Sequence, residues 1–456
     1  MRADTPSTPL APLAPAAPLP RSIGKYRVVA RLGEGATSEV FLARDEFAGR
    51  EVAIKRVYPG TAPGADVTLP QLQARFFAAE AALVGKLQHP NVVQILDAVP
   101  DPVAPYLVME YVPGTTLRDY CRPDRLLSLE QIVEIGFKCA MALGYVHRQG
   151  LIHRDVKPAN VLAQLQREQV VDIKITDFGS VLQLESDRTQ VFRVGSLAYM
   201  SPEQLDGSTL DARADMYSLG AVLYHLISGR APFDAATQAA LMGQIYTATP
   251  PPLAGLRDGV PVALEALVHD ALAKRADDRP ASWDDFAQRL AELVSRRLIP
   301  LQRLQGPLDS ERFNLLRTLE FFGEFDDVAL WEVVHRARWQ RFPAGHALYR
   351  KGQQGTSFHI LAQGEVQVLR ESELVTRLGA GTSVGEMAYL APNAELRTYS
   401  TDVVVAQPCI TVSFTPETLQ QLGASTRQLF DAAFIRVLVR RLHAAHEALA
   451  HPRRIV

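Results

Sequence analysis

The sequence predicts an α+β protein in which a two-lobed unit over residues 26–298 precedes a small β-barrel or jelly roll with flanking helices. Two observations predict the two-lobed unit: strand-like runs dominate up to about residue 115, and helical patterns follow. A third predicts the barrel, because short strand-like runs separated by glycines return between Arg341 and Phe414. The length of 456 residues and the 47% hydrophobic content suffice for several cores.

Composition excludes several classes of protein. Lys and Arg together number 48 against 50 Asp and Glu, so a net charge of −2 gives no electrostatic reason to bind nucleic acid or an anionic membrane. The three cysteines, Cys121, Cys139 and Cys409, lie far apart, which excludes a disulfide scaffold and the usual zinc sites. No apolar run reaches the ~18 residues of a membrane-spanning helix. We therefore expect a soluble, cytoplasmic protein without nucleic-acid or membrane partners.

The first elements follow a proline-rich start. Residues 1–25 are rich in Pro and Ala and lack periodicity, which predicts a disordered tail and not a signal peptide. A helix is expected over Arg75–Leu87, because Pro90 prevents its continuation. Three strands should come before this helix, at Tyr26–Leu32, Glu39–Arg44 and Glu51–Val57.

Two N-terminal capping signals predict later helices. Ser-Leu-Glu-Gln at residues 128–131 is a capping box that opens a helix with Ile132, Ile135, Leu143 and Val146 on one face. Ser282 opens a second helix that carries Phe286, Leu290 and Leu293. We expect a linker with a helix at 299–320, the barrel domain at 321–440 and a C-terminal tail at 441–456.

Several motifs with chemical meaning occur in order along the two-lobed unit. Leu-Gly-Glu-Gly at residues 32–35 lets backbone N–H groups approach phosphates, and Lys55 follows in an apolar strand. The sequence His-Arg-Asp-Val-Lys-Pro-Ala-Asn fills residues 153–160, Asp-Phe-Gly residues 177–179, and Ser-Pro-Glu residues 201–203. Each motif alone is weak evidence, but five ordered elements at workable spacings do not coincide by chance.

In these motifs, residues 26–298 resemble a eukaryotic-type protein Ser/Thr kinase, and the motif sequences are most similar to those of the bacterial branch of that family. Residues 107–114 and 149–162 match the motifs of the family at nearly every position. The resemblance implies that Lys55 holds the α- and β-phosphates of ATP and that Glu80 fixes Lys55 through an ion pair. It also implies that Asp155 accepts the proton of the substrate hydroxyl, while Lys157 neutralises the transferred γ-phosphate.

The resemblance further implies sites for Mg²⁺ and for the nucleotide. Asn160 and Asp177 would hold Mg²⁺. Asp215 would tie down the catalytic loop, and Glu203 with Arg279 would form the buried ion pair that stabilises the fold. The nucleotide would contact Leu32, Gly33, Gly35, Val40, Ala53 and Leu162, with the hinge backbone of Glu110 and Val112 binding adenine and Met109 as gatekeeper.

The chain departs from the family pattern at two places. Ser38 replaces the third glycine of the loop, and residues 59–65 form an insertion before Glu80. Every charged group of the transfer machinery is present all the same, so the resemblance implies an active enzyme. Because Arg154 precedes Asp155, we also expect phosphorylation of the segment after Asp177, at Thr189, to raise activity.

The barrel carries a second candidate site. A short helix after Gly385 would present N–H groups to an anion, Glu386 could accept a ribose hydroxyl, and Arg397 could bind a phosphate. Residues 321–440 resemble a cyclic nucleotide-binding domain. Arg397 lies eleven residues after Glu386, where the family has nine or ten, and Tyr399 stands where a small residue is expected. Thr398 is typical of cGMP-preferring members but also occurs in cAMP binders, so cAMP, cGMP and no ligand all stay open.

The sequence therefore predicts an ATP- and Mg²⁺-dependent kinase that phosphorylates Ser and Thr of proteins, itself included, under the control of a cyclic nucleotide. Two alternatives remain. The kinase fold could be inert, with the barrel as a docking or dimerisation module of a signalling scaffold. Alternatively, an active kinase could carry an inert barrel.

Overall fold

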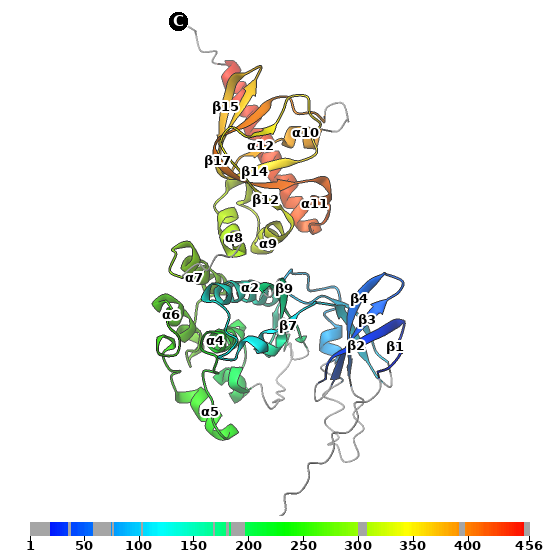
Figure 1. Ribbon diagram of the computed structural model, residues 1–456, viewed down its shortest axis with the longest axis vertical. Helices are drawn as coiled ribbons and strands as arrows, with labels where there is room; N and C mark the ends of the chain where they lie inside the picture. Colours follow the sequence, from blue (N-terminus) through cyan, green and yellow to red (C-terminus); the bar gives the residue numbers. More distant parts are fainter. Residues whose placement is uncertain are drawn as a thin grey trace, which may run out of the picture. The chain divides into compact units, whose positions relative to one another are not determined.

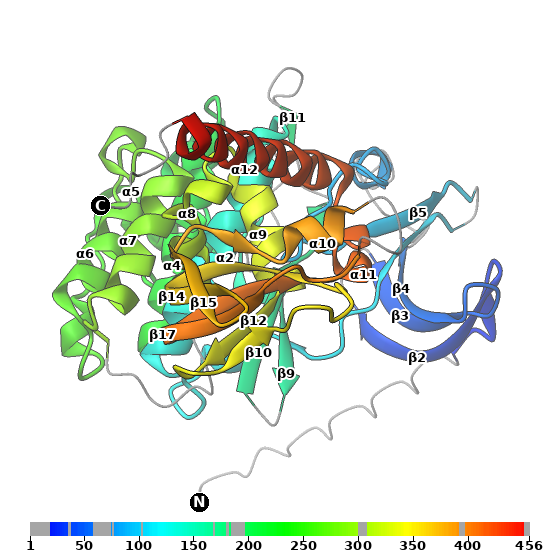
Figure 2. The ribbon, with the colours of Figure 1, turned by 90° about the horizontal axis from the view of Figure 1, so that it is seen from above.

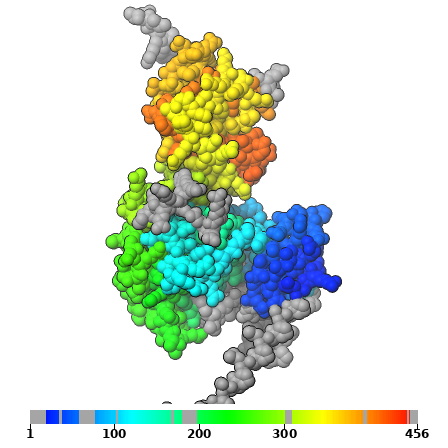
Figure 3. Space-filling model, viewed as in Figure 1, coloured from blue at the N-terminus to red at the C-terminus, as the bar shows by residue number. Residues whose placement is uncertain are grey.

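The computed structural model describes residues 19–34, 38–57, 74, 77–101, 104–166, 169–178, 182–183, 197–299, 308–391 and 397–450. The other residues are drawn in grey in Figures 1 and 3. They include residues 1–18, Gly35, the insertion at 59–65 and Thr189, so these sequence predictions lie outside the described part. The chain forms two compact units, Met1–Leu87 with Gln94–Val112 and Gln88–Val93 with Pro113–Val456.

The first unit is built on a six-stranded antiparallel sheet in the order β1-β2-β3-β4-β6-β5. Its core consists of alternating side chains from these strands, among them Phe41, Val52 and Ile54. The three predicted strands are confirmed within a few residues. The strands are β1 (Ser22–Ile23), β2 (Tyr26–Glu34), β3 (Ser38–Asp45), β4 (Arg50–Val57), β5 (Ile95–Val99) and β6 (Tyr106–Glu110).

The helix predicted for Arg75–Leu87 is shorter than expected. Its helical residues end at 81, and turns follow over 82–86. The hydrogen bonds there run from Leu83 N to Glu80 O and from Lys86 N to Leu83 O, which tightens the chain into successive turns. Gly85, within these turns, adopts a φ of 70°, which is incompatible with a helix that continues to Leu87.

The second unit begins with a helical region around α2. Ser128 Oγ accepts a hydrogen bond from the Gln131 N–H at 3.2 Å, and the Ser128 N–H donates in return to Gln131 Oε1 at 3.2 Å, which confirms the predicted capping box. Ser282 likewise caps α7. The helices are α2 (Leu129–Arg148), α3 (Pro202–Asp206), α4 (Ala212–Ser228), α5 (Gln238–Thr247), α6 (Val262–Ala271) and α7 (Trp283–Ser295), with 3₁₀ turns η1 (Leu117–Tyr120), η2 (Pro158–Asn160), η4 (Leu197–Tyr199), η5 (Leu253–Gly255) and η6 (Ala276–Asp278).

Two small sheets hold the motif-bearing loops of this region. The first has the order β10-β9-β7, and the second pairs β11 with β8. The strands are β7 (Thr115–Thr116), β8 (Leu151–Ile152), β9 (Val161–Gln166), β10 (Gln169–Ile175) and β11 (Leu182–Gln183). The loop at residues 153–160 thus begins directly after β8 and ends where β9 starts.

The barrel follows two helices and a 3₁₀ turn, α8 (Asp309–Arg317), η7 (Glu320–Phe322) and α9 (Asp327–Arg336). Its six strands are antiparallel, with the path β12-β17-β14-β15 and with β13 and β16 paired to β17 and β14. This arrangement confirms the predicted small barrel (Figure 1). The strands are β12 (Arg338–Phe342), β13 (Ala347–Tyr349), β14 (Phe358–Arg370), β15 (Glu373–Gly379), β16 (Ser383–Val384) and β17 (Asp402–Phe414), with helices α10 (Glu386–Leu390), α11 (Pro416–Gln420) and α12 (Ala424–Ala450).

The last helix differs from the prediction. Figure 2 shows α12 as one continuous helix, and it runs to Ala450, so it crosses the expected boundary between a domain ending at 440 and a tail starting at 441. The reason lies in the sequence, since no proline interrupts the run of Arg, Leu and Ala until Pro452. Among the described helices, none is both long and apolar enough to span a bilayer.

Candidate active site

In the first unit, Lys55 and Glu80 form a buried ion pair. Lys55 lies on β4, and its Nζ is 2.7 Å from Glu80 Oε1. Only 13% of the Lys55 side chain and 4% of the Glu80 side chain are exposed. A short, charge-assisted contact of this kind fixes the direction of the lysine side chain. The pair implied by the resemblance is therefore present.

The other nucleotide residues expected in this unit lie on neighbouring strands. The strand register places Val40 opposite both Gly33 and Lys55, and Ala53 opposite Met109. At the end of β6, Glu110 donates its amide N–H to Gln94 O at 3.0 Å. Of the remaining predicted residues, Leu32 is 46% exposed, Val112 is buried, and Leu162 lies in the second unit on β9.

In the second unit, two predicted residues, Lys157 and Asn160, meet at the Asp155 carboxylate. Lys157 Nζ lies 2.6 Å from Asp155 Oδ2, and Asn160 Nδ2 donates to the same oxygen at 3.0 Å. Asn160 Nδ2 also donates to the backbone oxygen of Asp155 at 2.8 Å. With Asp155 only 8% exposed, its carboxylate is oriented by a cation and an amide donor. A fixed carboxylate with a lysine beside it can accept a proton from a hydroxyl near a phosphate.

The loop that carries Asp155 is held by Asp215 of α4. The Asp215 carboxylate accepts the backbone N–H groups of His153 and Arg154, both at 2.8 Å. Complete burial raises the pKa of Asp215, and the neighbouring His153 and the two N–H donors act against that rise. Arg154 has a φ of 67°, a conformation that costs energy in a non-glycine residue, and the Asp215 contacts hold it there.

Asp177 is placed close to Asn160 by backbone contacts. The amide of Thr176 donates to Asn160 O at 2.9 Å, and the His153 ring contacts both Thr176 O, at 3.1 Å, and the Phe178 ring, with a centroid distance of 4.8 Å. Asp177 itself has a φ of 65°. The two candidate magnesium ligands thus share one anchored region of the second unit. The described residues contain no cluster of three or more His, Cys, Asp or Glu suited to a metal ion.

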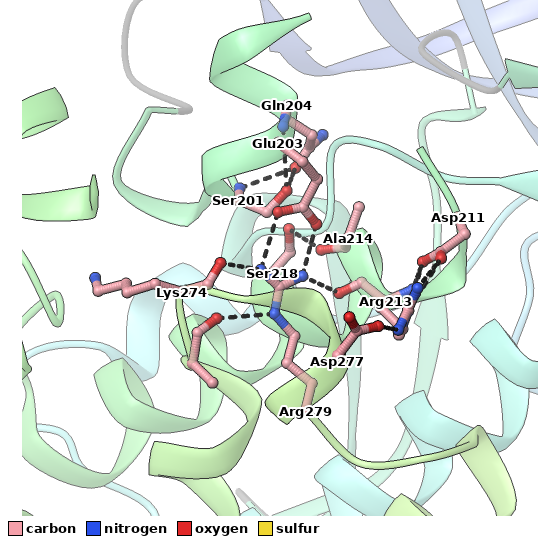
Figure 4. A network of polar contacts seen from close by, with 11 residues as sticks. Ser201, Glu203, Gln204, Asp211, Arg213, Ala214, Ser218, Lys274, Asp277 and Arg279 are labelled. Atoms are coloured by element: carbon pink, nitrogen blue, oxygen red, sulfur yellow. Dashed lines mark hydrogen bonds and ion pairs between the residues drawn. The ribbon is translucent and has the colours of Figure 1, made fainter. Parts of the chain in front are cut away.

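Glu203 and Arg279 form the structural ion pair that the resemblance implies (Figure 4). Arg279 Nη1 and Nη2 donate to the Glu203 carboxylate at 2.6 and 2.9 Å, and the arginine side chain is fully buried. Its remaining N–H groups donate to the backbone oxygens of Ala273, Arg213 and Lys274. A buried guanidinium with every nitrogen satisfied stabilises the fold and has no donor left for a substrate.

Sequence reasoning missed the contribution of Gln204. Its Nε2 donates to Arg154 O at 2.9 Å, so the backbone of Arg154 is held at its oxygen by Gln204 and at its N–H by Asp215. Ser201 caps α3 and exchanges hydrogen bonds with Gln204. The Ser-Pro-Glu-Gln sequence contains the signal for this capping box. It predicts the cap, though not the contact with Arg154.

In the barrel, Glu386 is paired with a residue from α12. Glu386 begins α10, is 1% exposed, and forms a hydrogen-bonded ion pair with Arg441 Nη1. Arg441 Nη2 donates to Ser383 O at 2.6 Å. Burial raises the pKa of Glu386, and the Arg441 cation opposes that rise. The predicted ribose-binding carboxylate thus has a protein cation as its partner.

The other predicted pocket residues have partners of their own. Arg397 is exposed, and its Nε donates to Ala391 O at 3.1 Å. Thr398 is exposed and bridges to Gln354. Tyr399 is 8% exposed and stacks on Tyr349 with ring centroids 3.9 Å apart. Tyr399 therefore belongs to the barrel core.

Comparison with known proteins gives two domain families. The protein kinase domain family matches residues 26–291, and the cyclic nucleotide-binding domain family matches residues 339–426. Similar curated proteins are the serine/threonine-protein kinases PknB of Mycobacterium leprae, 35% identical over 60% of this chain, and of Mycobacterium tuberculosis H37Rv, 34% identical over 59%. The probable serine/threonine-protein kinase PknB of Bifidobacterium longum is 35% identical over 58%.

These alignments cover 43%, 42% and 39% of the three relatives, so the chain spans about two fifths of the length of the proteins it matches. The kinase match itself extends over more than half of this chain and contains Lys55, Asp155 and Asp177. The chain belongs to the protein kinase domain family and carries a cyclic nucleotide-binding domain C-terminal to its kinase domain.

Proposed function

We propose that this chain transfers the γ-phosphoryl group of ATP to Ser and Thr hydroxyls of proteins, itself included. The observation that carries the proposal is the arrangement at Asp155, whose carboxylate is held by Lys157 and Asn160. In phosphoryl transfer, positioning and charge neutralisation supply most of the rate enhancement. Asp155 accepts the proton of the attacking hydroxyl, and Lys157 neutralises charge on the transferred phosphate. Lys55, fixed by Glu80, holds the α- and β-phosphates.

The donor set of the second unit fits Mg²⁺. Because Asn160 commits its Nδ2 to Asp155, its side-chain oxygen is the atom with which it can bind a cation, and Asp177 contributes a carboxylate. Mg²⁺ binds few protein oxygens and completes its octahedral shell with water and phosphate oxygens, so two protein ligands are sufficient. Bound there, Mg²⁺ would neutralise charge on the phosphates of ATP.

Incubation of the purified full chain with γ-labelled ATP and Mg²⁺ tests this proposal. We expect label on serine or threonine of the chain itself and of a generic substrate such as casein, and none in Lys55→Met, which lacks the cation for the phosphates. A wild-type chain that binds ATP but transfers no label would instead favour the inert scaffold.

We further propose that the barrel binds a cyclic nucleotide and thereby regulates the kinase. The match over residues 339–426 supports the ligand class. Glu386 is a buried carboxylate suited to a ribose hydroxyl, and the exposed Arg397 is a cation available to a cyclic phosphate. A ligand changes activity only through its difference in affinity between two conformations. Calorimetric titration of the full chain with cAMP and with cGMP tests binding, and kinase assays with each nucleotide test regulation.

Arg397→Ala is the informative variant for that titration. It removes the cation matched to the cyclic phosphate, so affinity should fall by roughly 2 kcal/mol, as for a lost charge-assisted contact. Heat from neither nucleotide, or an affinity unchanged in Arg397→Ala, would contradict the proposal and leave the barrel without this role.

Thr189 is the proposed activating phosphosite. The proposal rests on Arg154, a cation adjacent to Asp155 that a phosphate on this segment could contact. Mass spectrometry of the active enzyme should find phosphate on Thr189, and Thr189→Ala should lower activity. An unmodified Thr189 in fully active enzyme would be inconsistent with this assignment.

A further inference from the structure

Helices α8 and α9, which lie between the two matched families, pack against the kinase region of the second unit. Phe313 of α8 and Trp331 of α9 meet Phe137 of α2, with ring centroids 5.5 to 5.7 Å apart for the three pairs. Each of these three side chains is at most 1% exposed. The helices that precede the barrel therefore complete an aromatic core on the kinase domain.

Polar contacts specify the same interface. Lys138 of α2 is almost completely buried, and its Nζ lies 3.1 Å from Asp172 Oδ1 and 3.0 Å from Asp309 Oδ2 of α8. Beside it, Ser310 Oγ donates to Glu134 Oε2 at 2.7 Å. A buried ammonium needs several anionic partners, and α8 supplies one of them. A buried network in which these groups are paired specifies one packing of α8 on α2.

A hydrogen bond from Trp331 connects α9 to Asn91, which is bonded to strand β10. Trp331 Nε1 donates to Asn91 Oδ1 at 2.6 Å, and both residues are completely buried. Asn91 in turn donates to Asp172 Oδ1 and to Ile173 O, both at 2.8 Å. Its side-chain oxygen and nitrogen are thus both engaged, the oxygen by the residue from α9.

Asn91 sits in a segment with two connections. In the chain it follows the helical residues that carry Glu80, and it belongs to the short stretch Gln88–Val93 of the second unit. In space it is attached to β10, because Ile175 N donates to Asn91 O and Val93 N donates to Ile175 O, each at 2.8 Å. Strand β10 ends at Ile175, directly before Thr176 and Asp177.

We propose that Trp331 is a positioning residue of the kinase, which acts through Asn91 on the segment that follows Glu80 and on the strand that leads to Asp177. The inference rests on the proposed kinase function and adds to it a residue outside the kinase domain. It also gives the barrel a route to the kinase. Glu332, next to Trp331, accepts hydrogen bonds from Gly423 N at 3.1 Å and from Thr426 Oγ1 at 2.6 Å, at the start of α12. A shift of α12 would therefore act on α9.

The variant Trp331→Phe tests the proposal in the full chain. It keeps an aromatic ring against Phe137 and Phe313 and removes the N–H that Asn91 accepts. We expect kcat to fall about tenfold and KM for Mg-ATP to rise, because one buried hydrogen bond corresponds to roughly a factor of ten. Trp339→Phe is the matched control, since the buried Trp339 Nε1 has no hydrogen-bond partner in the described residues. Kinetics are measured well below the unfolding temperatures of all three proteins.

Amide hydrogen exchange at Val93 and Ile175 provides a readout that does not depend on activity. Faster exchange of these two amides in Trp331→Phe than in Trp339→Phe, together with the kinetic change, supports the proposal. A lower unfolding temperature with unchanged kcat, KM and exchange would mean that the interface only stabilises the fold, and would overturn it. If the wild-type chain transfers no phosphate, the proposed kinase function fails, and the exchange rates alone decide whether Trp331 anchors the Asn91 segment.

Discussion

The two candidate sites of the second unit are held in different ways. At the catalytic loop, Asp155 is oriented by Lys157 and Asn160, two and five residues further along the chain. At the barrel, Glu386 is paired with Arg441, which lies 55 residues away on a helix that follows the last strand. The Asp155 carboxylate of the first site has its side-chain partners within its own loop. The second depends on where one long helix lies.

The geometry at Asp155 is therefore fixed, whereas the geometry at Glu386 changes if α12 moves. Preorganised groups favour phosphoryl transfer because they need no rearrangement as charge develops. Arg441 occupies Glu386 Oε1, so a ligand that takes this oxygen displaces a side chain of α12, and its binding is linked to the position of that helix. This difference agrees with the roles proposed above, catalysis for the loop and ligand sensing for the barrel.

The largest effect is expected where the loop is changed at its centre. Asp155→Asn keeps the size of the side chain but removes the base and the anion that holds Lys157, so phosphotransfer should fall by about 3–4 kcal/mol or more, beyond 100-fold. Initial rates with labelled ATP measure it, and circular dichroism confirms folding. Near-wild-type transfer by Asp155→Asn would break the comparison, since the loop would then not be the catalytic site.

The next largest effect concerns the support of that loop. Asp215→Ala leaves the buried N–H groups of His153 and Arg154 without an acceptor, which should lower the free energy of unfolding by roughly 2–4 kcal/mol and reduce activity. Urea unfolding measures it. Asp211→Ala is the control on the same helix: it removes the half-exposed N-cap of α4 and should cost about 1 kcal/mol. Equal losses in the two variants would argue against a special role for Asp215.

A smaller effect, confined to the barrel, depends on pH. Burial lowers the pKa of His359 from 6.5 to about 4, while its Nδ1 contacts Thr411 Oγ1 at 2.8 Å. As the pH falls below 6.5, His359 is protonated in the unfolded chain but not in the folded barrel. The stability present above pH 6.5 is therefore lost as the pH falls toward 4. Between pH 7 and 5 the loss should be about 2 kcal/mol.

Urea unfolding of the barrel at both pH values checks this contribution. His359→Gln should lose less stability than the wild type between pH 7 and 5, by the same amount. His346→Gln, which changes an exposed histidine, should behave as the wild type. Parallel losses in wild type and His359→Gln would show that His359 does not set the pH dependence of the barrel.

The smallest effect sharpens the comparison most directly. Arg441→Ala releases Glu386 from its cation, so a cyclic nucleotide no longer competes with it, and affinity should rise severalfold, or about 1 kcal/mol. Arg440→Ala removes the adjacent arginine, which pairs with the exposed Glu320, and should leave affinity unchanged. Weaker binding in Arg441→Ala, measured by calorimetry, would mean that Arg441 assists the ligand and does not oppose it.

Local patterns predicted much of this fold. The strands of the first sheet, the capping boxes and the catalytic loop depend on residues a few positions apart, and the sequence displays such relations directly. The helix expected to reach Leu87 ended at residue 81 and gave way to turns that include Gly85, a change that hydrophobic periodicity does not reveal. The Glu203–Arg279 pair was accessible only through the family resemblance, since 76 residues separate its members.

The contacts of α8, α9 and α12 could not be predicted for the same reason. An apolar helix face shows that something covers it but does not identify the partner, so Phe313 and Trp331 gave no indication of Phe137 or Asn91. Arg441 stood out only as one basic residue among several on α12. Its partner is 55 positions away and became evident only from the structure.

The buried Lys138 has a consequence for synthesis on the ribosome. While the chain grows, Glu134, Lys138 and Asp172 are made long before Asp309 and Ser310. Domains generally fold as they emerge, N-terminal parts first. The kinase domain therefore first folds while Lys138 lacks its partner Asp309 and Phe137 is exposed. Its last interior partners arrive only with α8 and α9. During that interval the nascent kinase exposes the apolar surface around Phe137 that α8 and α9 later cover, the kind of surface that chaperones bind.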